Sequence, residues 1–160
     1  MTQTLLPGIQ YLQNIHPLAV HFPIAFLFGS SLFYLLALLS SRETMTTTAF
    51  SLLIVGTLGA ASAVGTGIYA EPGVILAPSV RGHLFSKQQD FMITTLCVSA
   101  ILAIWAIIAR PFPRKGRALF VLLLFALLGV MSVGADYGAR MVYDYNAGGT
   151  ACPQPIEFVK

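Results

Sequence analysis

Four long apolar stretches constrain this chain more than any other feature. They cover residues 18–40, 48–70, 91–109 and 118–135, and each is close to the about 20 residues that an α-helix needs to cross a bilayer. Lipid offers the backbone no hydrogen-bond partner, so such a segment must satisfy its own polar groups as a helix. We therefore predict an all-α fold, a bundle of four transmembrane helices. This membrane domain is expected over 14–145, between an N-terminal segment 1–13 and a C-terminal tail 146–160.

The composition agrees with a membrane protein and excludes other classes. Apolar residues make up 56% of the chain and charged residues 9%, whereas soluble domains have about 45–50% and about 25%. Nine basic and six acidic side chains cannot cover the surface of a soluble 17.2 kDa domain. The basic residues form no stripe that would follow a nucleic acid backbone. The expected partner is therefore the lipid bilayer, and we expect no nucleic-acid partner.

The charges on the connections predict how the bundle is oriented. The third connection carries Arg110, Arg114, Lys115 and Arg117 and no acidic residue, whereas the first two connections are neutral in net charge. Short loops rich in Lys and Arg stay in the cytoplasm. Loops one and three are thus expected to be cytoplasmic and both termini periplasmic. In a bacterium this describes a multi-pass protein of the inner (cytoplasmic) membrane.

Three histidines are predicted to meet at the outer face. His16 and His21 bracket the start of the first span, and His83 precedes the third span. Pro78 and Ser79 read as a helix start, so the third helix should extend outward from about Val80. The three imidazoles then occupy one layer roughly ten ångströms thick. One helical stripe, expected to face the bundle, would hold His83, Lys87, Asp90, Thr94 and Cys97.

A shared cofactor explains this layer best. Neutral imidazole is the commonest metal ligand of proteins, and two imidazoles on facing helices of a bundle suit one b-type haem. His16 and His21 are about 140° apart around a helix, so the favoured iron ligands are His21 and His83. His16 would be a neighbouring or propionate-binding group, and Arg81 or Arg140 would hold the propionates as charged donors. Without a Cys-x-x-Cys-His motif, a c-type haem is excluded.

Small residues in the second span predict close packing. Gly59, Ala63 and Gly67 repeat every four residues, which brings them onto one face of a helix. Such a face lets another backbone approach closely. The same face would also make room for a flat cofactor, and the sequence leaves both interpretations open.

The first span also carries a resemblance to a known family. The segment His16-Pro17-Leu18-Ala19-Val20-His21-Phe22-Pro23-Ile24-Ala25 resembles a bacterial family of predicted membrane proteins, catalogued as domain-of-unknown-function family 2231. The likeness continues through Thr66-Gly67, the later His83, and Gly138 with Arg140-Met141-Val142-Tyr143. It implies a four-helix membrane domain. In that family the domain can be joined to Rieske iron–sulfur domains, which implies redox work.

These observations favour a membrane electron-transfer subunit resembling a cytochrome b. It would pass electrons between a redox protein at the outer face and quinone or another membrane subunit. We expect it to be a subunit of a respiratory or dehydrogenase complex without independent catalytic activity. Two alternatives stay open. Three imidazoles suit a copper or zinc site, and a cofactor-free membrane anchor or assembly subunit needs no site at all.

The predicted orientation is tested by reporter fusions. A fusion at the C-terminus to a reporter that is active only in the periplasm should be active, and a fusion within 110–117 should not, because the basic loop is retained in the cytoplasm. The opposite pattern would invert the topology and move the histidine layer to the cytoplasmic face.

Overall fold

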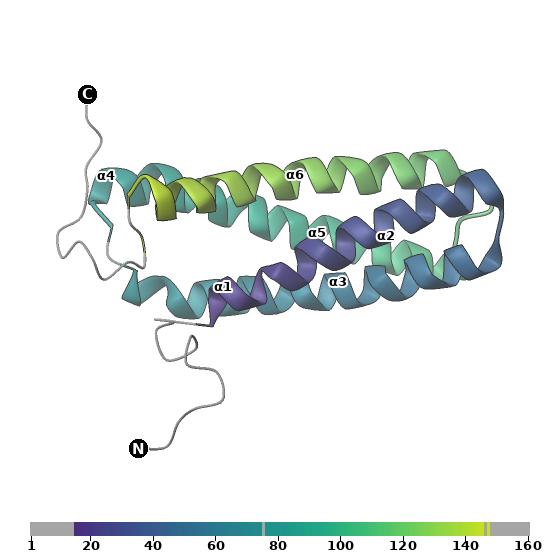
Figure 1. Cartoon of the computed structure of the whole chain (residues 1–160), viewed down its shortest axis with the longest axis horizontal. Helices are drawn as coiled ribbons and strands as arrows, with labels where there is room; N and C mark the ends of the chain where they lie inside the picture. The colour runs from purple at the N-terminus through teal and green to yellow at the C-terminus, as the bar shows by residue number, and fades with distance from the viewer. Residues whose placement is uncertain (1–14, 75, 146, 148–160) are drawn as a thin grey trace, which may run out of the picture.

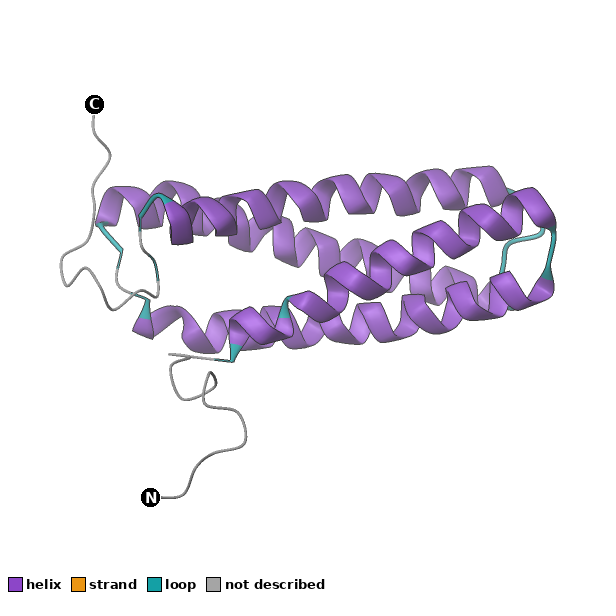
Figure 2. Cartoon of the chain, viewed as in Figure 1, coloured by secondary structure: helices purple, strands orange, loops and turns teal. Residues whose placement is uncertain are grey.

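The structure is a bundle of four long helices (Figures 1 and 2). This computed structural model describes residues 15–74, 76–145 and 147, and over those residues it contains helices and connections but no strand. The elements are α1 (His16–Ala19), α2 (His21–Ser40), α3 (Glu43–Ala70), the 3₁₀ turn η2 (Glu71–Gly73), α4 (Pro78–Val80), the π-helical turn η3 (Arg81–Phe85), α5 (Ser86–Ala109) and α6 (Arg117–Tyr143). Four runs, His16–Ser40, Glu43–Ala70, Pro78–Ala109 and Arg117–Tyr143, are long and apolar enough to cross a membrane. The predicted four-span, all-α fold is confirmed.

The helices extend beyond the predicted spans. The second helix begins at Glu43 and the fourth continues to Tyr143. The third run begins at Pro78, which confirms the predicted helix start near Val80. With 28 residues, α3 is about 42 Å long, whereas the hydrocarbon core is about 30 Å thick. The apolar stretches therefore marked the part of each helix that lies in lipid, and the helical backbone continues past it.

The helices pack in two antiparallel pairs, α2 with α3 and α5 with α6. The connections between the partners of both pairs lie at one end of the bundle, and the start of α1 and the end of α6 lie at the other (Figure 1). We call these the basic end and the terminal end. The prediction that loops one and three share a side is confirmed. Toward the basic end α2 lies beside α6, and toward the terminal end it lies over α3, so the two pairs separate there (Figure 1).

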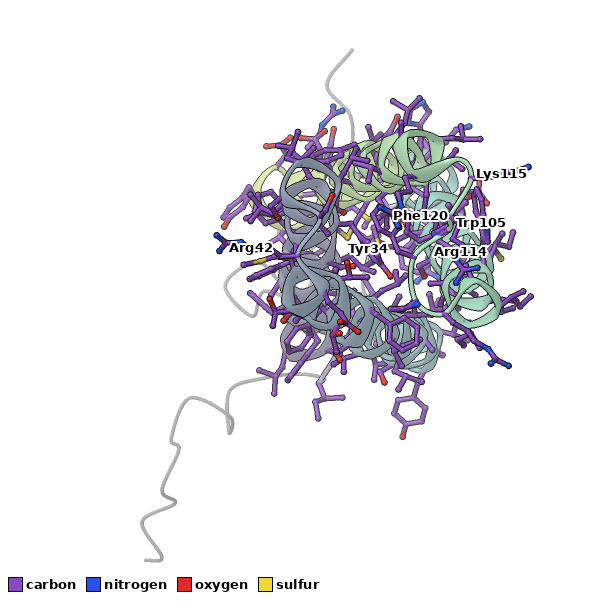
Figure 3. All side chains as sticks on the ribbon, turned by 90° about the vertical axis from the view of Figure 1, so that its right-hand side faces the viewer. Tyr34, Arg42, Trp105, Arg114, Lys115 and Phe120 are labelled. Atoms are coloured by element: carbon purple, nitrogen blue, oxygen red, sulfur yellow. The ribbon has the colours of Figure 1, made fainter. Side chains whose placement is uncertain are left out.

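Aromatic packing closes the basic end. Tyr34 of α2 is fully buried, and its ring centroid lies 5.1 Å from that of Phe112 and 5.0 Å from that of Phe120. The Tyr34 hydroxyl donates a hydrogen bond of 2.9 Å to the backbone carbonyl of Pro111. Trp105 packs edge-on against Phe120. Figure 3 shows Tyr34 and Phe120 inside the ring of helices at this end, where they join α2 to the α5–α6 connection.

A second, smaller cluster lies at the terminal end. Val80 and Leu84 of the third run, and Ala77 just before it, pack with Met141 of α6, and all four are almost completely buried. This cluster covers the end of the bundle where the two helix pairs separate.

Glycines bring α3 close to α2. A Cβ atom at Gly59 would lie 3.1 Å from the backbone nitrogen of Pro23, and one at Gly56 would lie 2.8 Å from the Leu27 side chain. Ala63, on the same face as Gly59, is 3% exposed. At Gly59 the small-residue face predicted for this helix is therefore a packing face, and its partner there is α2. At Gly67 the same face contacts the imidazole of His16 in α1.

This packing predicts that leucine substitutions at two glycines of α3 differ in their effect on folding. Gly59→Leu should sharply lower the yield of folded protein in detergent, because its new side chain meets the backbone of α2. Gly65→Leu is the matched control and should leave the yield unchanged, since a Cβ at Gly65 meets no atom within 4 Å. Size-exclusion chromatography and thermal unfolding measure both variants. Equal behaviour of the two would show that the Gly59 face is not packed.

Candidate functional site: a cavity at the terminal end

A cavity lies where the two helix pairs separate. It has two adjoining chambers, of about 360 Å³ and about 160 Å³. The larger volume is within the range of about 300–1,000 Å³ that is common for small-molecule and cofactor sites. Residues that line both chambers come from all four helical runs and include His16, Ala63, Gln88, Met92 and Gly138. The walls are otherwise mostly apolar, so a few polar groups would orient a ligand.

The cavity lies at the level where the helices leave the lipid. The 20 residues of α2 from Ser40 back to His21 span about 30 Å. Counting 20 residues from the basic ends of the other helices, Glu43, Ala109 and Arg117, reaches Ser62, Asp90 and Asp136. The larger chamber extends from Ala60, below this level, to residues above it. A ligand there would be held at the boundary between lipid and water.

His16 is the histidine most enclosed by the cavity. It is half-buried, and its imidazole lies against Gly67, where an added Cβ would be 3.0 Å from Cε1. Its Nδ1 lies 3.2 Å from the hydroxyl oxygen of Thr66. That hydroxyl also donates to the carbonyl of Ser62, at 2.9 Å. Gly67 therefore makes room for the ring, and Thr66 fixes its orientation.

His21 also faces the cavity. Its Nδ1 lies 2.6 Å from the backbone carbonyl of Pro17. Because a carbonyl only accepts, Nδ1 carries the proton and the neutral ring has its lone pair on Nε2. The side chain is exposed and lines the larger chamber. A ring held in this way is oriented as metal-binding histidines usually are.

The structure brings His16 and His21 to one chamber, which the spacing argument did not expect. That argument assumed one continuous helix. The helix is interrupted at Val20, between α1 and α2. Pro23 has no N–H to offer the carbonyl four residues before it, which weakens the helix there. The chamber is also wide enough for both side chains to reach it.

His83 lies elsewhere. Its side chain is exposed, and it is not among the residues that line the two chambers. The stripe predicted to face the bundle is exposed along its length, so that expectation is wrong; it comprises His83, Lys87, Asp90, Thr94 and Cys97. The buried face instead carries Leu84, Thr95 and Ser99. Thr95 and Ser99 donate to carbonyls of their own helix, so burial leaves neither hydroxyl unsatisfied.

The two arginines have other contacts. Arg81 donates through Nη2 to the carbonyl of Val74 at 2.8 Å, and its Nη1 lies 3.5 Å from a carboxylate oxygen of Glu71. It thereby ties the turn after α3 to the start of the third run. Arg140 pairs with Asp144, at 3.8 Å. Neither arginine lines a chamber, and their roles toward propionates stay predictions.

Sequence reasoning missed the opposite wall of the cavity. A Cβ at Gly138 would lie 3.1 Å from Nε2 of Gln88, and one at Gly134 would collide with the methyl group of Met92. Met131 of α6 lines the larger chamber as well. The sequence signal that could have revealed this wall is a matched four-residue spacing. Gln88 and Met92 on α5 are four residues apart, and so are Gly134 and Gly138 on α6. Each glycine receives one of the long side chains.

The described ranges contain no group of three His, Cys, Asp or Glu side chains that could hold a metal ion. The three-histidine copper or zinc site, which requires such a group, is therefore not favoured by this arrangement.

A family comparison agrees with the fold. The profile of a family described as predicted membrane protein, DUF2231, matches residues 12–151. The chain belongs to this family. The resemblance noted from the sequence is thus confirmed, and with it the assignment of this DUF2231 protein to a lipid bilayer. It matches no curated protein and no solved structure.

Proposed function

We propose that this protein is a redox subunit of the bacterial inner membrane that binds one b-type haem in the larger chamber. It would pass single electrons between a redox protein at its terminal end, on the periplasmic side, and quinone or another membrane subunit. The observation that carries the proposal is the geometry of His21. Its Nδ1–H is held by the Pro17 carbonyl, and its ring lines an apolar chamber.

Side chains on facing helices of the chamber offer ligands for haem iron. His21 on α2 offers an imidazole, and Met92 and Met131 on the facing helices offer thioethers. Histidine with methionine is one of the axial pairs that proteins use for haem iron. The remaining wall is largely apolar, as the macrocycle requires. When bound, the haem would supply one-electron chemistry, and the protein would set its ligands, burial and access.

The arrangement supports His21 more strongly than the pair of His21 and His83. His83 lies outside the chamber walls, so it would need to change its position to reach the same iron. His16 keeps the neighbouring role expected for it, because its Nδ1 is engaged with Thr66 and it lines both chambers. A ring placed in this way would tune a bound haem through contact.

Absorption spectra of purified variants test the proposal. Protein expressed with haem supplied should show the sharp visible bands of a reduced b-type haem, with one iron per chain by elemental analysis. His21→Ala removes a strong iron bond, so haem should be lost or become high-spin. His16→Ala should keep a low-spin haem with a shifted midpoint potential. His83→Ala serves as the matched control and should leave spectrum and potential unchanged.

Other outcomes assign the site differently. Loss of haem in both His21→Ala and His83→Ala would restore that pair as the ligands. Copper or zinc lost in all three variants would identify a metal site without haem. Protein that binds neither haem nor metal under these conditions would sink the proposal and leave a membrane anchor or assembly subunit.

A further inference from the structure

Exposed apolar side chains of α3 and α5 line the smaller chamber. Among its lining residues are Ile68 of α3, 52% exposed, and Ile93 of α5, 41% exposed. Ile93 lies three residues inside the level of Asp90, and Ile68 lies six residues beyond that of Ser62. An opening between α3 and α5 would therefore reach from the outermost acyl chains at Ile93 into the headgroup layer at Ile68. A molecule that enters from there must be soluble in the bilayer.

The chamber has the size of one small ring. An apolar cavity of about 150 Å³ holds a benzene molecule, and this chamber measures about 160 Å³. A ligand with a longer apolar part would leave that part in the opening, between Ile68 and Ile93. A ring joined to an apolar tail satisfies both conditions.

Of the three polar side chains described as lining the smaller chamber, His16, Gln88 and Gln89, two come from different helices and also line the larger chamber. The imidazole of His16 comes from α1, and the amide of Gln88 comes from α5, beside Gly138. Imidazole and amide groups can each donate or accept a hydrogen bond. A quinone presents two carbonyl acceptors on opposite sides of its ring, and its reduced form presents two hydroxyl donors there. His16 and Gln88 suit both forms, whereas a lysine or arginine can only donate.

The charge of the walls argues against a phospholipid head. No Lys, Arg, Asp or Glu is among the residues described as lining the smaller chamber. A phosphate group would be desolvated there without a cation, which is costly. A plain acyl chain would gain nothing from the two polar groups.

From the opening between α3 and α5, the volume of the smaller chamber and its polar groups, we infer that this chamber binds the ring of a prenylated quinone taken from the bilayer. The ring would lie between His16 and Gln88. This deepens the proposed function, because it gives the quinone partner a binding site. It does not depend on the haem, since the chamber and its polar groups belong to the protein alone.

Photolabelling in nanodiscs tests the inference. The probe is an azido derivative of a 1,4-benzoquinone with a short alkyl tail, and the competitor is the same quinone without the azide. Mass spectrometry should locate the label on 60–70 of α3 and 85–93 of α5. Gln88→Leu keeps the size of the side chain but removes its amide, so the half-maximal competitor concentration should rise about tenfold. Thr94→Val, on the exposed face of the same helix, is the control and should match the unchanged protein.

A second pair of variants separates blocking from misfolding. Gly138→Leu pushes a side chain toward Gln88 and should abolish specific labelling. Gly129→Leu is its control, because a Cβ there meets no atom within 4 Å. The inference is overturned by absence of specific labelling, by equal competition from a ringless alkane alcohol, or by labelling that Gln88→Leu and Gly138→Leu leave unchanged. Specific labelling of protein that was expressed with haem supplied but bound none would support this site while contradicting the haem proposal.

Discussion

The packing of Tyr34 at the basic end is the contact on which the shape of the bundle depends. Helices in lipid gain little from the hydrophobic effect toward one another, so close packing and interhelical hydrogen bonds must hold them. Tyr34 supplies both, through the rings of Phe112 and Phe120 and through the carbonyl of Pro111. These contacts fix α2 to the α5–α6 connection. The crossing of α2 from α6 to α3 then opens the bundle at its other end.

Glycines determine which helices pack closely around that opening. On the α3 side, Gly56 and Gly59 let α2 approach until backbone atoms would touch an added Cβ. On the α6 side, Gly134 and Gly138 receive Met92 and Gln88. The helix pairs are therefore tight within themselves, while the space between them remains partly unfilled. The cluster of Val80, Leu84 and Met141 covers that space at the terminal end.

The sequence predicted the parts of this structure that lipid determines. Apolar length located all four spans, and the pattern of connections placed loops one and three together. Helix ends were missed where the backbone continues into water, as at Glu43 and Tyr143. Hydropathy carries no signal there, since a protruding helix and a polar loop have similar compositions.

The site was predicted less completely, for a different reason. Polarity was taken to mark the face of α5 that turns inward, yet the inward face carries Thr95 and Ser99, which bond to their own helix. Charged and ionisable side chains of α5 stay on the outside near the membrane boundary, where water reaches them. His16 and His21 were recognised because histidine is rare in this chain. Gln88 and Met92 became visible only when the fold set them against glycines of α6.

The position of the cavity limits what the protein can do alone. Its polar groups lie at one membrane boundary, and the rest of the span toward the basic end is filled by Leu27, Leu53 and the aromatic cluster around Tyr34. A single redox group at the terminal end would stand about 20–30 Å from the opposite boundary. Electrons could not cross that filled interior without another carrier. A redox function at this cavity would therefore connect a partner at the same face with a carrier that moves within the bilayer.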